Sequence, residues 1–289
     1  MSSVFLVSGA SRGLGRAIVA AALESGHHVV AGVRHLDALA DLQQTVGDRL
    51  AVVSLDVTDT DATRAAVTTA LSRFGRLDVL VNNAGYANIA PIEDVALDDF
   101  TAQLNTNLLG VVRLTQAALP LMRQQRSGHI IQVSSVGGRL ATPGLAAYQS
   151  AKWAVGGFSS VLAAEVAPLG IKVTVLEPGG MRTDWAGPSM RVDAIRPEYQ
   201  QTVGQAAAMH NSAQLAANDT NKVARVAVDL IKEDNPPLRL LIGPEAYAYA
   251  TAAARAQLSQ DEHWRELSQS TVADDATPGQ IDPLGRLGQ

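Results

Sequence analysis

The sequence has no cysteine, which excludes a disulfide framework, a thiolate metal site and a cysteine nucleophile. It has no apolar run close to the length of a membrane span, which is about 18 residues. Its first residues do not have the pattern of a signal peptide. No block of basic residues is present, and the net charge of −5 argues against a nucleic-acid partner. We therefore expect no metal, no nucleic acid and no membrane as partners, and a cytoplasmic location.

Charged residues are also few, at 18% of the chain, whereas hydrophobic residues make up 47%. This balance is typical of a globular protein with a sizeable core rather than of a disordered chain. The 289 residues contain no internal repeat of about 20–50 residues and no low-complexity linker. We therefore predict one domain over residues 1–257 and a C-terminal extension over residues 258–289.

Short β-rich runs alternate with segments of helical spacing, and this alternation predicts an α/β protein. The predicted strands cover residues 4–8, 28–33, 50–55, 78–81, 129–134, 171–176 and 238–242. The predicted helices cover residues 16–25, 36–46, a segment that ends near 73, 97–125, 147–167, 219–232 and a short stretch from about 245. Residues 183–218 lack clear periodicity, and a stretch of that length is more often a lid or binding loop than a passive connection.

A glycine-rich loop, residues 9–15, joins the first predicted strand to the first predicted helix. Glycine permits a tight turn and lets backbone N–H groups approach a diphosphate at the helix N-terminus. The spacing G-x-x-x-G-x-G matches neither the usual dinucleotide loop nor a Walker A loop, because no Gly-Lys-Ser/Thr follows. The alternative is a glycine-rich turn without a ligand.

Two arginines favour a phosphorylated dinucleotide. Arg34 follows the second strand, where an NAD-selective fold would carry an acidic residue, and Arg12 lies in the glycine loop. Two guanidinium groups suit a 2′-phosphate, to which arginine can donate a bidentate pair of hydrogen bonds. Each arginine alone could simply be solvated, but together they favour NADP over NAD.

Tyr148 and Lys152 lie four residues apart, so that both side chains leave one face of the predicted helix. A nearby ammonium group favours the phenolate, lowers the pKa of the phenol and makes it a usable acid or base. Upstream, Ser134 and Ser135 end a predicted buried strand, at the edge where open parallel sheets bind ligands. An ordinary helix pair is the alternative for Tyr148 and Lys152.

Other polar residues follow predicted strands or interrupt apolar patterns. Residues 82–85, Asn-Asn-Ala-Gly, form a turn by composition, but their amides could also tie neighbouring strands together beneath a ligand. Asp56 could accept a hydrogen bond from an adenine amino group, or Thr58 or Asp59 could cap the next helix. Asn107 stands in an apolar helical pattern, where an ordinary asparagine is the alternative.

Together these motifs resemble the classical short-chain dehydrogenase/reductase family. The segments that carry the resemblance, over about residues 3–245, are residues 8–15, 82–85, Asn107, Ser135, Tyr148-x-x-x-Lys152 and Pro178-Gly179. The resemblance implies a single Rossmann-type domain, with a doubly wound parallel sheet of about seven strands and helices on both faces. It also implies a homodimer or homotetramer, with helices near residues 99–125 and 147–167 at the main interface.

The resemblance further implies a role for each catalytic candidate. Tyr148 would exchange a proton with the reacting oxygen, and Lys152 would lower the pKa of Tyr148 and bind the nicotinamide ribose. Ser135 would hold the reacting oxygen, and Asn107 would position a water in a proton relay. Ser135 is preferred to Ser134 because the family's serine stands thirteen residues before its tyrosine. The residues implied to bind the dinucleotide are Gly9, Ser11, Arg12, Gly13, Leu14, Gly15, Arg34, Asp56, Val57, Asn83, Ala84, Gly85, Tyr148, Lys152, Pro178, Gly179, Met181 and Thr183.

The expected activity is NADP(H)-dependent hydride transfer between an alcohol and a ketone or aldehyde. The expected pocket is mostly apolar, which favours a hydrophobic substrate; it includes Tyr86, residues 136–143 with Gly137, and residues 184–218 with Trp185, Tyr199 and Met209. Two alternatives stay open: an NADP(H)-sensing regulatory protein on the same fold, and an epimerase or dehydratase with tightly held NAD. No role is assigned to Glu177 or to the extension.

Overall fold

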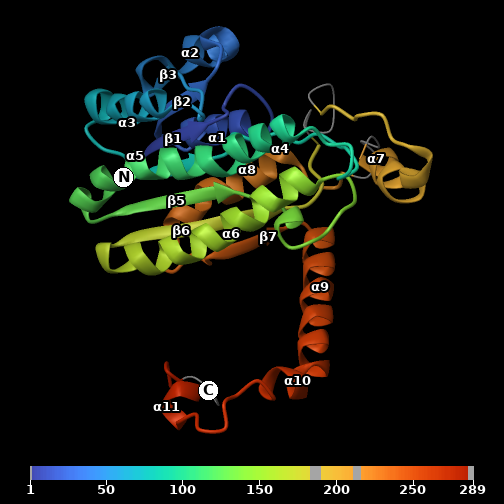
Figure 1. The fold of residues 1–289 in the computed structure, drawn as a ribbon. Coiled ribbons are helices and arrows are strands. Elements are labelled where there is room, and N and C mark those ends of the chain that lie inside the picture. Colours follow the sequence, from blue (N-terminus) through green and yellow to red (C-terminus); the bar gives the residue numbers. More distant parts are fainter. Residues whose placement is uncertain (1, 183–189, 211–215, 286–289) are drawn as a thin grey trace.

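The computed structural model describes residues 2–182, 190–210 and 216–285. In this part of the chain a seven-stranded sheet runs through the centre, its neighbouring strands paired in parallel in the order β3-β2-β1-β4-β5-β6-β7 (Figure 1). The strands are β1 (Val4–Ser8), β2 (His28–Val33), β3 (Leu50–Ser54), β4 (Val79–Asn82), β5 (Gly128–Val133), β6 (Ile171–Pro178) and β7 (Arg239–Ile242). The predicted fold class is confirmed, and each strand begins and ends within one or two residues of its predicted bounds.

Helices cover both faces of this sheet (Figure 1). The α-helices of the described residues are α1 (Gly13–Glu24), α2 (Ala40–Val46), α3 (Thr60–Phe74), α4 (Leu97–Leu104), α5 (Gly110–Gln125), α6 (Ala146–Val166), α7 (Gln205–His210), α8 (Thr220–Asp229), α9 (Pro244–His263), α10 (Arg265–Gln269) and α11 (Pro278–Ile281). Helices α1 and α8 pack on one face, and α3, α5 and α6 pack on the other.

The alternation of side chains along β1 shows how the sequence builds these layers. Phe5 and Val7 lie in the apolar cluster under α1 and α8, whereas Val4 and Leu6 lie in the cluster under α3 and α5. Since successive side chains of a strand point to opposite faces, a strand that is apolar at every position must be covered on both sides.

The chain starts at β1 in the middle of the sheet, moves to β3 at one edge and then returns through β4 towards β7. The connection after β1 therefore leads towards β3, whereas the connection after β4 leads towards β7. The chain thus leaves the carboxyl ends of these two neighbouring strands in opposite directions. This is the switch point at which open α/β sheets hold their ligands.

The helix predicted over residues 97–125 contains an irregular turn. Helices α4 and α5 are joined without a break by a π-helical turn, Asn105–Leu109. Such turns are rare and often occur at functional sites. The buried side chain of Asn107 lies in this turn.

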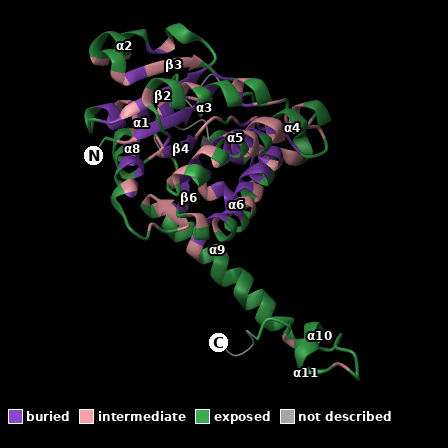
Figure 2. Cartoon of the chain, turned by 90° about the vertical axis from the view of Figure 1, so that its left-hand side faces the viewer, coloured by how far each residue is buried: buried purple, intermediate pink, exposed green. Residues whose placement is uncertain are grey.

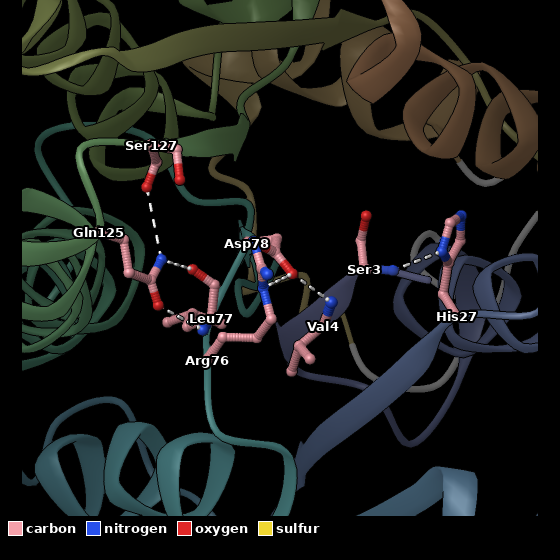
Figure 3. Close-up of polar contacts among 8 residues, drawn as sticks. All are labelled: Ser3, Val4, His27, Arg76, Leu77, Asp78, Gln125 and Ser127. Atoms are coloured by element: carbon pink, nitrogen blue, oxygen red, sulfur yellow. Dashed lines mark hydrogen bonds and ion pairs between the residues drawn. The ribbon is translucent and has the colours of Figure 1, made fainter. Parts of the chain in front are cut away.

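Polar contacts close the amino-terminal edge of the sheet, away from the switch point (Figure 3). The Asp78 carboxylate accepts a hydrogen bond from the Val4 amide at 2.8 Å and two from Arg76 Nε at 2.8 and 2.9 Å. The side chain of Gln125, at the end of α5, bonds both backbone polar groups of Leu77. These contacts fix the starts of β1 and β4 and leave the opposite edge for a ligand.

The last helices extend away from the sheet (Figures 1 and 2). Helix α9 is 20 residues long, whereas the sequence predicted only a short helix. Ala246 and Ala250 are buried against the domain, and the rest of α9 and α10 is mostly exposed. The predicted boundary at residue 257 therefore falls inside a continuous helix.

Candidate functional site

A cavity of about 1150 Å³ opens at the carboxyl edge of the sheet, over the switch point. Most of the residues predicted to bind a dinucleotide or to act in catalysis line this one cavity. They are Gly9, Ser11, Arg12, Gly13, Leu14, Arg34, Asp56, Val57, Asn83, Ala84, Gly85, Ser135, Tyr148, Lys152, Pro178, Gly179 and Met181, and the predicted substrate residues Tyr86 and Gly137 line it as well. The fold thus collects residues that are up to 172 positions apart, Gly9 and Met181, around one space.

The glycine loop lies directly against the loop that follows β4. Gly9 has a φ of +64°, and a Cβ atom there would lie 2.8 Å from the Ala84 Cα atom. At Gly15 a Cβ atom would lie 2.3 Å from the Gly9 carbonyl oxygen, so that only glycine lets α1 start this close to the loop. Asn83 Nδ2 donates to the carbonyl oxygens of Ser8 and Gly9 at 3.0 and 3.1 Å. This confirms that an amide of the Asn-Asn-Ala-Gly segment ties neighbouring strands together.

Charged side chains from the glycine loop and from the ends of β2 and β3 line the cavity. Arg12 and Arg34 are exposed and line it, together with Asp56. The Asp56 carboxylate accepts hydrogen bonds from the Thr58 amide and hydroxyl at 2.8 and 2.7 Å. These bonds, with the charge of Arg34, hold the pKa of Asp56 below its usual value. Asp59, one of the two candidates, is the residue that caps α3.

Tyr148 lies in the first turn of α6, with only 6% of its surface exposed, and its hydroxyl is hydrogen-bonded to Ser135. Ser135 Oγ also accepts a hydrogen bond from the Gly137 amide at 3.0 Å. Ser134 Oγ instead donates to the Lys152 carbonyl oxygen at 3.3 Å. Of the two adjacent serines, Ser135 is therefore the one bonded to the phenol.

Burial shifts the pKa values of Tyr148 and Lys152 in opposite directions. It raises the pKa of Tyr148 to about 12, against the opposing effect of the Ser135 hydrogen bond. It lowers the pKa of Lys152 to about 8. Both shifts have the same cause, because a low-dielectric site penalises phenolate and ammonium alike.

The expected lowering of the Tyr148 pKa by Lys152 is therefore wrong for this structure. Lys152 Nζ lies 5.6 Å from the centroid of the Tyr148 ring and donates to the Val133 carbonyl oxygen at 2.8 Å. Its spacing along the helix is as predicted, but burial, which the spacing does not reveal, dominates the pKa of the phenol.

Asn107 lies beside the cavity rather than in its lining. Its Nδ2 donates to the carbonyl oxygens of Tyr86 and Gln103, each at 2.9 Å, and its Oδ1 accepts from the Tyr86 amide at 3.1 Å. The side chain is fully buried, and its two bonds to Tyr86 hold that backbone to the π-helical turn.

Comparison with known proteins agrees with this geometry. The family model described as short chain dehydrogenase matches residues 3–193. The chain is 52% identical over 270 residues to Oxidoreductase BOA17 of Botryotinia fuckeliana, which covers 93% of this chain and 98% of that protein. The chain belongs to the short-chain dehydrogenase family.

Solved structures place the fold in the same family. A short-chain dehydrogenase from Streptomyces avermitilis has a TM-score of 0.89 and 35% identity, over 94% of this chain and 98% of that one. A metagenomic short-chain oxidoreductase solved in complex with NADP has a TM-score of 0.66 and 26% identity, over 84% of this chain and 97% of that one.

In this short-chain dehydrogenase, two site contacts escaped the sequence analysis. The buried amide of Gln149 lines the cavity, accepts from the Thr142 amide at 2.8 Å and donates to the Thr142 hydroxyl at 3.1 Å. Glu177, which had no assigned role, forms ion pairs with Arg139 and Arg239. Only the position of Gln149 beside Tyr148 could have indicated the first contact, and no local signal indicates the second.

Other predicted site residues have different positions. Tyr199, expected in the pocket, does not line the cavity but donates a hydrogen bond from its hydroxyl to Glu93 at 2.7 Å. Gly15, the last residue of the glycine loop, is buried and does not line the cavity. Thr183 and Trp185 lie outside the described residues.

Proposed function

We propose that the protein is an NADP(H)-dependent oxidoreductase that interconverts a hydrophobic ketone or aldehyde and the corresponding alcohol. The single observation that carries the proposal is the Tyr148 hydroxyl, which is hydrogen-bonded to Ser135 and opens on the same cavity as the glycine loop. An acid–base group and a nucleotide-binding loop around one space are what carbonyl reduction requires.

The residues around the glycine loop fit a dinucleotide. The close approach at Gly9 and Gly15 leaves a backbone-lined cradle at the N-terminus of α1, which suits a pyrophosphate. Solved structures with this fold include complexes with NADP and with NAD, so the fold alone does not select one. The charges of Arg12 and Arg34 support the phosphorylated nucleotide.

Tyr148, Ser135 and Lys152 supply the proton chemistry in this proposal. When bound, the reduced nicotinamide supplies the hydride. The pKa of Tyr148 lies above neutral pH, so the phenol is protonated there, as a proton donor to a carbonyl oxygen must be. Ser135 holds that oxygen, and Lys152 supplies positive charge beside the phenol. Asn107 supports the site by fixing the backbone at Tyr86.

An apolar wall next to the phenol supports a hydrophobic substrate. Tyr148 packs in a cluster that combines segments before α4, at the start of α6 and near α7. The cluster consists of Ala87, Ile89, Leu145, Tyr148, Met190, Val203 and Ala207. Of this cluster, Ala87, Leu145 and Tyr148 line the cavity, as do Gly137 and Tyr86, and an uncharged lining of this kind favours an uncharged, apolar substrate.

We also propose a homodimer or homotetramer. Trp153 and Val161 on α6 and Leu109 at the start of α5 are large apolar side chains that remain exposed. They lie on the helices that the resemblance places at the main interface. Covering these side chains with a second copy would remove apolar surface from water.

The substitution Tyr148→Phe tests the proposed function. A panel of ketones, aldehydes and alcohols, assayed with NADPH and NADH in parallel, first identifies a substrate of the natural protein. The variant should then bind NADPH as tightly as the natural protein but lose turnover by about 10²–10⁴-fold, because the proton donor is gone. The control is Tyr247→Phe, at an exposed tyrosine of α9, which should keep full turnover. Unchanged turnover of Tyr148→Phe would refute the proposal, and NADPH binding without turnover of any substrate would favour a binding protein.

A further inference from the structure

We propose that Arg139, Glu177 and Arg239 form a positioning cluster that holds the turn carrying Ser135 against α6. The proposal rests on the proposed function, in which Ser135 acts with Tyr148. None of the three side chains lines the cavity, so each would act through other residues.

Glu177 is the centre of this cluster. Its side chain is 0% exposed, at the carboxyl end of β6. Arg139 Nη2 lies 2.5 Å from one carboxylate oxygen, and Arg239 Nη2 and Nε lie 2.6 and 2.8 Å from the other. A carboxylate without exposure to water needs such partners, because an unpaired buried charge is strongly destabilising.

The two arginines come from different parts of the site. Arg139 directly follows the 3-10 turn Val136–Gly138, which Ser135 caps. The turn is closed by backbone bonds from the Gly138 amide to Ser135 and from the Arg139 amide to Val136, each 2.9 Å long. A change in the position of Arg139 therefore moves the segment that carries Ser135.

Arg239 connects the cluster to α6, the helix that carries Tyr148 and Lys152. It begins β7, and a Cβ atom at Gly156 would lie 2.6 Å from its Nη2 atom. Gly156 is one turn beyond Lys152, and Lys152 is one turn beyond Tyr148, so the guanidinium rests on the helix face that carries both. This explains one of the two glycines in the middle of α6; at Gly157 the space is open.

The turn itself touches the same helix. A Cβ atom at Gly138 would lie 2.9 Å from the Lys152 carbonyl oxygen. The carboxylate of Glu177 thus joins the Ser135 turn, through Arg139, to β7 and α6, through Arg239. Replacing a buried ion cluster by apolar residues is often neutral or favourable for stability, so a positional role is a better account of this one.

The test combines Arg139→Met with Ser135→Ala in a double-mutant cycle. Arg139→Met removes the charge and keeps a long side chain, and it should lower kcat by about ten- to a hundredfold with NADPH affinity unchanged. Arg139→Lys should recover most of the loss. In the Ser135→Ala background, Arg139→Met should lower kcat by less than about twofold, because the residue through which it acts is already absent.

A matched control is Arg76→Met at the opposite edge of the sheet, where Arg76 pairs with Asp78 (Figure 3). It removes a more exposed arginine–carboxylate ion pair that lies away from the cavity, and it should leave kcat unchanged. Equal losses from Arg139→Met in both backgrounds, or a loss that follows the unfolding midpoint across all variants, would overturn the proposal.

Hydrogen exchange tests this proposal independently of the proposed function, because the measurement needs no substrate. Arg139→Met should increase exchange of the Gly137 and Gly138 amides, which bond to Ser135, by about tenfold or more, and Arg76→Met should not. Unchanged exchange would overturn the positioning role even if the enzyme is active. Increased exchange in a protein that reduces no carbonyl compound would instead count against the proposed function alone.

Discussion

At the scale of single residues, burial decides the chemistry of the cavity more than sequence spacing does. Tyr148 and Lys152 are only 6% and 4% exposed. Their four-residue separation correctly predicted that they share a helix face, but the pKa of the phenol is raised, not lowered. Spacing along a helix reports direction, whereas a pKa depends on how much water the packed chain leaves around a group.

The proposed preference for NADP can be tested at a single side chain. Arg34→Ala should weaken NADPH binding by about ten- to a hundredfold, the loss expected when a charge-assisted hydrogen bond to a phosphate is removed. NADH, which has no 2′-phosphate, should bind within about twofold of its original affinity. Fluorescence titration with both nucleotides measures the two constants.

The control for this measurement is Arg64→Ala, at an exposed arginine of α3 that forms an ion pair with the nearby Asp61 carboxylate. It should change neither constant. Equal weakening of NADPH and NADH by Arg34→Ala would mean that Arg34 does not select the phosphorylated nucleotide.

At the scale of elements, the strands and most helices follow from local pattern. Apolar runs predicted the strands closely, because a strand covered on both faces must be apolar throughout. The π-helical turn at Asn105–Leu109 was not predicted, since its residues fit the spacing of an ordinary helix. It forms where the Asn107 side chain bonds two backbone carbonyl groups, a tertiary contact as well as a local one.

Two buried polar side chains link strands β5 and β6 and make stability depend on pH. A ring nitrogen of His129 lies 3.0 Å from the Thr174 hydroxyl, and burial lowers the pKa of His129 from 6.5 to about 4. The unfolded chain therefore binds more protons than the folded one between these two values, and stability is lost as pH falls from about 6.5 towards 4. Between pH 7 and 4.5 the free energy of unfolding should fall by roughly 2 kcal/mol from this group.

Urea unfolding at several pH values checks this prediction. His129→Gln keeps a hydrogen-bonding side chain but cannot titrate, so its stability should fall less over the same range. Part of the slope should persist, since burial also lowers the pKa of His27. Parallel slopes for the two proteins would contradict the role of His129.

At the scale of the whole molecule, the Rossmann-type domain and the C-terminal arm, which consists of helices α9 to α11, differ in their packing. Ala246 and Ala250 anchor the start of α9, but most side chains from residue 254 to residue 285 are exposed (Figure 2). The arm therefore contributes little to the core of its own chain. Among the described helices, none combines the length and apolar character needed to cross a bilayer.

Removal of all residues after His263 should leave the melting temperature within about 2 °C of the full chain, because little buried surface is lost. Removal from Pro244 onwards should lower it, because Ala246, Ala250 and the bond between Glu245 and Asn218 are lost as well. Calorimetry and light scattering on both shortened proteins measure stability and assembly. If the form that ends at His263 melts at a lower temperature than the full chain, or if it dissociates, a second copy covers the arm.

The sequence by itself determined the seven strands, the two-sided cover of the sheet and the family. Apolar periodicity and glycine spacing are local patterns, so they can be recognised in the sequence alone. Only the tertiary structure decided that Tyr148 is hydrogen-bonded to Ser135, that its pKa is raised, and that Glu177 pairs with Arg139 and Arg239. Those facts depend on which distant groups meet and how much water they exclude. Both are properties of the packed chain, and no window of the sequence contains them.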